Sequence, residues 1–158
     1  VEAARVALEG APLQAVLNRM QSLRKRTHIF IHIETLENLR RGGRAAALMP
    51  IVDRLARALS LKPLLNMVEG ELRLLAVVRS TQKSIRRIRG QIVALGPLEH
   101  LLVMHIRARD RAEELADELA LATGLARERI FIGEAGAALA CHGGAGVIAA
   151  AAWPEQTE

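Results

Sequence analysis

Residues 61–95, LKPLLNMVEGELRLLAVVRSTQKSIRRIRGQIVAL, carry the pattern that decides the fold. Two apolar runs, 61–68 and 71–78, flank the pair Glu69-Gly70, which is typical of a two-residue hairpin turn. After this hairpin the apolar residues recur at helical spacing. They are Ile85, Ile88, Ile92 and Leu95. The stretch therefore predicts two antiparallel strands followed by a helix.

Strand-like and helix-like segments alternate along the rest of the chain. Further strands are predicted at 28–33, 100–106 and 129–133, and helices at 1–10, 12–26, 36–41, 45–60, 82–95 and 110–123. Ser80 and Thr81 are expected to cap the helix after the hairpin, and Asp110 with Glu113 predicts a capping box at the start of a later one. This alternation with one hairpin predicts an α/β fold, a two-layer domain in which helices pack on a mixed β-sheet.

The composition sets the class of protein. The 158 residues suit one domain with an aliphatic core, because 51% are hydrophobic and only 2% are aromatic. The single cysteine, Cys141, excludes a disulfide within the chain and favours a reducing compartment, so we expect a cytoplasmic protein. The nearly uncharged run 135–153 is rich in Ala and Gly and too weakly apolar to predict a membrane span.

The charge pattern points to an anionic ligand or partner. The net charge is +5, and the cations are arginines apart from Lys25, Lys62 and Lys83. Arginine holds carboxylates and phosphates through its planar fork. Nucleic acid is not expected as a partner, because the chain offers few aromatic side chains on which bases could stack. A nucleic-acid module built on the basic helix face remains an alternative. That face consists of Arg86, Arg87 and Arg89.

Residues 134–150, EAGAALACHGGAGVIAA, contain the candidate site. A lone His142 precedes three glycines, which are Gly143, Gly144 and Gly146. Glycine permits positive φ and lets a ligand approach the main chain, so the stretch predicts a tight loop beside a binding site. The alternative is a strand, a glycine turn and a second strand, in which a buried carbonyl satisfies the imidazole.

The sequence lacks the common enzyme motifs. It contains no P-loop, no GxGxxG after a strand and no GxSxG. Cys141 and His142 are neighbours in a segment expected to be extended, where adjacent side chains point to opposite faces and cannot pair for thiol catalysis. No cofactor or metal is expected. Arg44, Arg79 and His142, each beside glycine or at a strand end, remain as candidates to hold an anionic head group.

Five motifs occur in the order and spacing of a known family. They are IETLENLRRGGR at 33–44, LKPLL at 61–65, MVEGEL at 67–72, VVRSTQKS at 77–84 and CHGGAG at 141–146. Together they resemble the carboxy-terminal half of the DegV family of bacterial fatty-acid-binding proteins, over the region from about Leu13 to Trp153. The run LRRGGR is the most specific of these pieces.

This resemblance implies a two-domain α/β protein that encloses one long-chain fatty acid, with the acyl chain in an apolar tunnel and the carboxylate at the domain junction. Some family members present that carboxylate to a separate fatty acid kinase, so a lipid-binding protein is implied and not an enzyme. Residues 1–26 would then be a helical remnant of a missing amino-terminal domain, 27–153 the carboxy-terminal lipid-binding domain, and 154–158 a tail.

The resemblance also implies roles for single residues. His142 matches the histidine that hydrogen-bonds the carboxylate, and Arg79 matches an arginine near the head group that is associated with kinase engagement. Arg44 belongs to the motif that begins the helix flanking the tunnel. The glycines that shape the loop are Gly143, Gly144 and Gly146. The candidate tunnel wall is the apolar stripe of Leu48, Ile51, Val52 and Leu55.

A second interpretation remains open. Dihydroxyacetone-kinase relatives of this fold contain a subunit in which a histidine holds a small carbonyl substrate. The long apolar stripe within 48–55 favours an acyl chain over such a substrate.

Overall fold

The computed structural model describes residues 2–38 and 61–155. Its six strands form one mixed sheet in the order β3-β2-β1-β6-β4-β5. They are β1 (His28–His32), β2 (Lys62–Val68), β3 (Glu71–Val78), β4 (Leu98–His105), β5 (Ile130–Glu134) and β6 (Ile148–Pro154). Only β4 and β5 are parallel, and every other neighbouring pair is antiparallel. The predicted mixed α/β sheet is confirmed.

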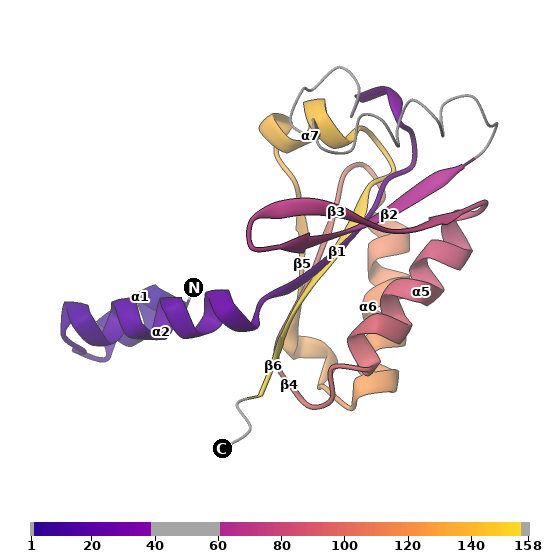
Figure 1. Ribbon diagram of the computed structural model, residues 1–158. Helices are drawn as coiled ribbons and strands as arrows, with labels where there is room; N and C mark the ends of the chain where they lie inside the picture. Colours follow the sequence, from indigo (N-terminus) through magenta and orange to yellow (C-terminus); the bar gives the residue numbers. More distant parts are fainter. Residues whose placement is uncertain (1, 39–60, 156–158) are drawn as a thin grey trace.

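The helices differ in how they relate to the sheet. They are α1 (Glu2–Leu8), α2 (Leu13–Arg26), α5 (Thr81–Val93), α6 (Arg109–Thr123) and α7 (Ala137–Gly143). Helices α5 and α6 lie side by side against the sheet, while α1 and α2 form a hairpin that extends away from it (Figure 1). No helix in 2–38 or 61–155 is both long and apolar enough to cross a membrane.

The main core lies between the sheet and the inner faces of α5 and α6. The helices contribute Ile88, Ile92, Ala112, Ala116, Leu115 and Leu119. The strands contribute Phe30, Leu64, Leu101, Val103, Ile130, Ile148, Ala150 and Ala152. Phe30 is the one aromatic side chain in this cluster, so the core is aliphatic, as the composition predicted.

The predicted hairpin turn is present, and one of the two residues predicted to cap α5 does so. Glu69 and Gly70 both have positive φ, 53° and 86°, as a two-residue turn of the primed type requires. Ser80 caps α5, because its side chain accepts a hydrogen bond from the Lys83 amide. Thr81 was also expected to cap this helix, which is wrong, because its hydroxyl donates to Glu34.

The capping box predicted for α6 is also wrong. The helix begins at Arg109 with Ala108 as its N-cap, and no side chain caps it. Asp110 therefore lies inside the first turn, and the Glu113 carboxylate accepts a 2.8 Å hydrogen bond from Nε of Arg109. Arg107, two residues before this helix, has a left-handed φ of 48°.

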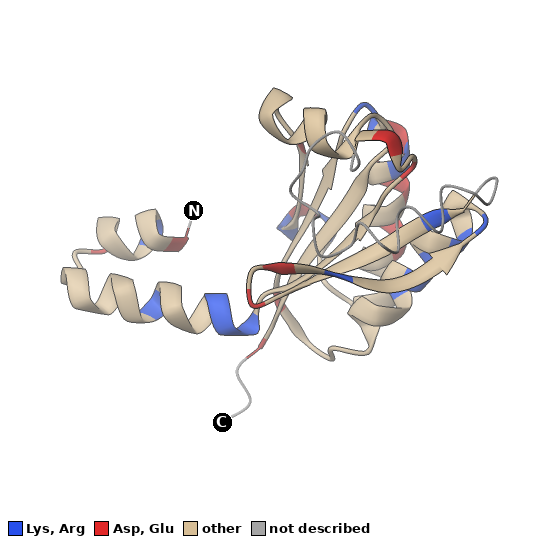
Figure 2. Ribbon diagram, turned by 45° about the horizontal axis from the view of Figure 1, so that its top comes forward, with Lys and Arg blue, Asp and Glu red and all other residues tan. Residues whose placement is uncertain are grey.

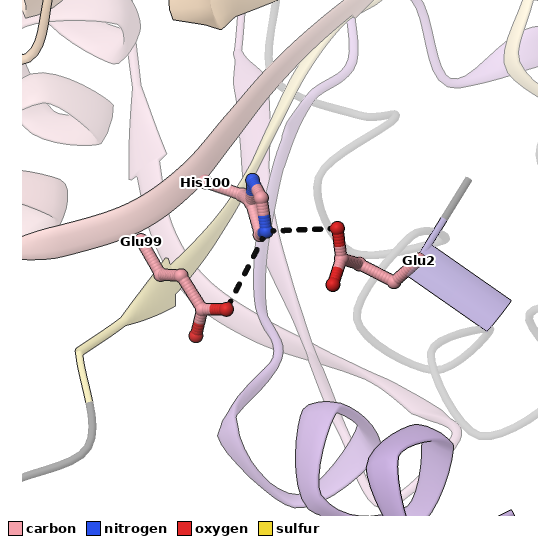
Figure 3. Close-up of side chains that lie close together, drawn as sticks. All are labelled: Glu2, Glu99 and His100. Carbon is pink, nitrogen blue, oxygen red and sulfur yellow. Dashed lines mark ion pairs between the residues drawn. The ribbon is translucent and has the colours of Figure 1, made fainter. Parts of the chain in front are cut away.

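A polar cluster joins the helical hairpin to β4. Nη2 of Arg19 contacts carboxylates of both Glu2 and Glu99, and Nη2 of Arg26 lies 3.0 Å from Glu99. The imidazole Nε2 of His100 lies 3.4 Å from Glu2 and 3.5 Å from Glu99 (Figure 3). Since α1 buries no residue, these polar contacts are the main link between α1 and the sheet.

Candidate functional site

The candidate site lies at one end of the sheet. Strands β1, β3, β4 and β5 end at this edge, and β2 and β6 begin at it. The pairing of Ile148, the first residue of β6, with His32 and His105, the last residues of β1 and β4, shows this arrangement. The turn that contains Arg79 follows β3, and the glycines precede β6. The topology therefore brings the separate candidate segments to the same edge of the molecule.

The glycine-rich segment differs from the extended form that the sequence suggested. Cys141 and His142 lie in the last turns of α7, so the prediction of an extended segment there is wrong. The predicted tight loop follows this helix: Gly144 and Gly146 have φ of 79° and 86°, and the Gly146 amide donates a 2.8 Å hydrogen bond to the carbonyl of Ile106. We call residues 143–146 the glycine loop.

Close packing explains two of these glycines. A β-carbon at Gly146 would lie 2.9 Å from both Cβ and Cγ of Glu34. A β-carbon at Gly144 would overlap the side-chain amide of Asn38. The segment after β1 therefore forms the support of the glycine loop, and both positions also require the left-handed backbone that glycine adopts freely.

His142 has an unsatisfied ring nitrogen. Its side chain is half-buried, and Nδ1 is shielded from solvent without a hydrogen-bond partner among the described residues. Buried polar atoms in folded proteins are nearly always hydrogen-bonded. Among the described residues, this nitrogen is therefore an exception that calls for an explanation.

Glu34 is the centre of a charged cluster beneath the glycine loop. Its Oε2 accepts hydrogen bonds from Nε2 of His32 at 3.0 Å and from Oγ1 of Thr81 at 2.9 Å, and its Oε1 accepts from Nζ of Lys62. Nη1 of Arg111 lies 3.6 Å from Oε2. Thr81 begins α5 and Arg111 lies in the first turn of α6, where helix dipoles favour a negative charge.

These contacts control protonation in the cluster. Burial raises the pKa of Glu34, but hydrogen bonds from Lys62, His32 and Thr81 outweigh it and bring the pKa down to about 2. Burial lowers the pKa of His32, and the neighbouring Glu34 carboxylate offsets this only in part. At neutral pH the His32 imidazole is therefore uncharged, and its Nε2–H donates to the ionised carboxylate.

Arg79 lies two residues before Thr81, so the Thr81–Glu34 hydrogen bond ties the turn that carries it to the support of the glycine loop. The Arg79 side chain is exposed and forms no ion pair within 2–38 and 61–155. Arg44 and the candidate tunnel wall, Leu48, Ile51, Val52 and Leu55, lie outside the described residues.

A hollow of about 310 Å³ adjoins Gly146 of the glycine loop. It is lined by Arg107, Ala108, Arg109, Asp110, Arg111 and Gly146. Basic and acidic segments alternate on α6 beside it, and the last turn of α2 forms a separate basic segment (Figure 2). The surface next to the loop is thus arginine-rich, which suits an anionic group.

The sheet face opposite α5 and α6 is apolar and partly exposed in the described chain. Two rows of paired residues cross it. One row contains Met67, Ile29, Ala151, Leu102 and Phe131, and the other contains Leu65, Ile31, Ala149, Met104 and Gly133. Small side chains occupy the β6 positions of both rows, so the larger neighbours on β1 and β4 flank a shallow apolar strip. Phe131 at its border is 68% exposed.

One group of side chains has the composition of a metal site. Atoms of Glu2, Glu99 and His100 lie within 4.8 Å of one another. Both carboxylates already bind arginines, and the hydrogen bond from Arg5 holds the pKa of Glu2 at about 2. A cation would have to displace Arg19, so the cluster is better suited to joining α1 to β4 than to holding a metal.

Comparison with known proteins identifies the family. The model of the DegV family, described as uncharacterised proteins, matches residues 1–155. The chain belongs to the DegV family. A DegV domain-containing protein of Streptomyces coelicolor, SCO2569, is 32% identical over 149 residues, which cover 92% of this chain and 51% of that protein. The chain thus spans about half the length of this relative.

Solved structures of DegV proteins have the same fold. The fatty acid binding DegV family protein SAG1342 of Streptococcus agalactiae is 30% identical with a TM-score of 0.81, covering 98% of this chain and 54% of that one. The fatty acid kinase B3 protein of Streptococcus pneumoniae, loaded with linoleic acid, is 15% identical with a TM-score of 0.83. The match covers 97% of the DegV chain and 53% of the pneumococcal protein.

Sequence reasoning missed the residues at the centre of the site. Glu34, Lys62 and Thr81 all lie inside motifs that suggested the family, but none of the three was predicted to be a site residue. A signal was present, since each is a polar residue within three positions of one end of a predicted strand. The structure shows that these strand ends meet.

Proposed function

We propose that this DegV chain binds a long-chain fatty acid, with its carboxylate at the glycine loop and its acyl chain along the apolar sheet face. His142 would hydrogen-bond the carboxylate, and Gly143, Gly144 and Gly146 would shape the loop around it. The observation that carries the proposal is the unpartnered Nδ1 of His142 on α7, a helix whose Ala140 packs against the buried cluster that contains Leu65 of the apolar face. A carboxylic acid with a long tail complements both features.

The energetics favour an acyl chain as the ligand. Burial of each methylene contributes about 0.8 kcal/mol, so a long aliphatic chain gains affinity from a strip of Ile, Leu, Met and Ala side chains. Arg79 and the arginine-rich hollow provide positive potential near the carboxylate. Leu48, Ile51, Val52 and Leu55 are proposed as a further wall of the tunnel, and Arg44 as the start of that wall.

The proposal extends to partners. The chain spans 51% of the Streptomyces relative, so we expect an amino-terminal domain to complete the carboxylate site. The pneumococcal protein of the same fold is described as a fatty acid kinase B3 protein, which supports presentation of the bound acid to a separate kinase. The exposed Arg79 is the proposed contact for that kinase. We place the protein in the cytoplasm as a lipid carrier that does no chemistry itself.

Mass spectrometry of ligand extracted from the purified full-length protein tests this function. We expect one long-chain fatty acid per protein, and we expect His142→Ala to retain much less of it. His28→Ala is the matched control, because His28 is exposed at the opposite end of β1. A small polar ligand would instead support the dihydroxyacetone-kinase-like interpretation, and equal retention by both variants would remove His142 from the site.

A further inference from the structure

Both segments that carry the candidate ligand contacts touch the same glutamate. The glycine loop after His142 packs on Cβ and Cγ of Glu34, and the turn after Arg79 donates to its carboxylate through Thr81. These segments are more than 60 positions apart in sequence. Among the described residues, Glu34 is thus a point of contact shared by both.

We propose that Glu34 is a positioning residue of the lipid site, which fixes the glycine loop of His142 and the turn of Arg79 relative to each other. This inference rests on the fatty-acid-binding function proposed above. Glu34 acts through its neighbours and is not proposed to contact the fatty acid.

The chemistry of the cluster requires a carboxylate at this position. Both oxygens of Glu34 accept from donors: Oε1 from Lys62, and Oε2 from His32 and Thr81. A carboxylate has acceptor sites on both oxygens, whereas an amide of the same shape has one oxygen and one NH₂ group. Glutamine would therefore turn a donor toward Lys62 or toward the His32 and Thr81 pair.

The charge of the cluster also matters for an anionic ligand. Lys62 and Arg111 are both held near Glu34, and His32 is uncharged, so these groups carry one net positive charge. Glu34 thus holds two cations close to the glycine loop without making the cluster negative. Without it, Lys62 and Arg111 would lose the group that keeps them there.

Nuclear magnetic resonance of the ligand-free full-length protein tests the positioning role without lipid. In Glu34→Gln we expect the Gly146 amide to exchange with solvent at least tenfold faster, because the support of the loop loses charge-assisted hydrogen bonds. The control is Glu99→Gln at the other end of the sheet, where the carboxylate binds Arg19 and Arg26, and its Gly146 amide is expected to exchange at the wild-type rate. Equal exchange rates in Glu34→Gln and wild type would overturn the inference.

Lipid binding provides the second measurement. We expect Glu34→Gln to raise the Kd for oleate by about tenfold, and Glu99→Gln to leave it unchanged although it removes a carboxylate from a comparable ion-pair cluster at the other end of the sheet. Equal weakening by both variants would mean that Glu34 acts only through overall stability. Absence of binding by the wild type would contradict the proposed function, while the amide exchange rates would still decide the positioning role.

A milder substitution covers the case in which Glu34→Gln does not fold. Thr81→Val removes only the hydroxyl that joins the Arg79 turn to Glu34 and keeps the shape of the side chain. We expect resonance shifts in both the 79–81 turn and the glycine loop. Shifts confined to the turn would show that Glu34 does not connect the two segments.

Discussion

Gly146 packs directly on Glu34, since a β-carbon at position 146 would lie 2.9 Å from two side-chain carbons of the glutamate. This contact joins the glycine loop to the segment after β1. It also coincides with a left-handed φ of 86°. Position 146 therefore requires glycine for two reasons, its left-handed backbone and the lack of space for a β-carbon beside Glu34.

Gly146→Ala is expected to destabilise the fold by about 2 kcal/mol or more, from backbone strain of about 1 kcal/mol and overlap with Glu34. Gly70→Ala separates these causes. Gly70 has the same φ of 86°, but nothing lies within 4 Å of its added β-carbon. We expect a loss of only about 1 kcal/mol there. Urea unfolding measures both values, and equal losses would contradict the proposed overlap.

The Glu34 cluster predicts acid sensitivity. The pKa of Glu34 falls from 4.5 to about 2 on folding, so its contribution is complete above pH 4.5 and is lost as the pH falls toward 2. Its hydrogen-bonded and charged neighbours are His32, Lys62, Thr81 and Arg111. We expect the free energy of unfolding to fall by on the order of 2 kcal/mol across this window.

Urea unfolding at pH 7, 5, 4 and 3 checks this prediction. Glu34→Gln is expected to be less stable than wild type at pH 7 and to lose less stability on acidification. Glu2 also has a pKa of about 2, so the wild-type slope contains its contribution as well. A variant curve parallel to that of the wild type would show that Glu34 does not titrate with folding.

The hairpin of α1 and α2 is expected to depend on Arg19. This side chain contacts both Glu2 and Glu99, whereas α1 buries no residue of its own. In Arg19→Ala we expect amide exchange in α1 to become faster while the core strands keep their protection. Arg24→Ala is the control, since Arg24 is exposed in the last turn of the same helix. Faster exchange in β4 and β6 would indicate a wider role for Arg19.

Local patterns explain which parts of the fold could be predicted. The hairpin at 69–70 and helices α5 and α6 follow from turn chemistry and apolar periodicity, which are properties of neighbouring residues. Helix α7 was missed because its alanines and glycines show no periodicity, although alanine favours helix. The order of the strands depends on pairing between distant segments, which no local pattern encodes.

The candidate site, like the fold, could be predicted only where it depends on neighbouring residues. The glycine loop and its positive φ angles could be inferred, because glycine is the residue that adopts them without strain. The Glu34 cluster could not, because Thr81 is 47 positions from Glu34 and Lys62 is 28 positions away. Contacts of this kind appear only once the strand ends are placed together. The predicted roles of Arg79 and His142 stay predictions.

The apolar sheet face leads to a prediction about acyl chain length. Ala151 lies between Ile29 and Leu102 on β6, five residues after Gly146, which is a distance of at most about 17 Å at the rise of an extended strand. A larger side chain there would obstruct the far part of a long acyl chain and spare a short one. We therefore expect Ala151→Leu to weaken binding of oleate by about tenfold, the effect of 1.4 kcal/mol, and to leave decanoate binding unchanged.

Ala122→Leu on the exposed side of α6 is the control for the added apolar surface. Titration of both acids into the full-length variants decides the matter, since equal weakening for oleate and decanoate would mean that the tail does not extend along β6.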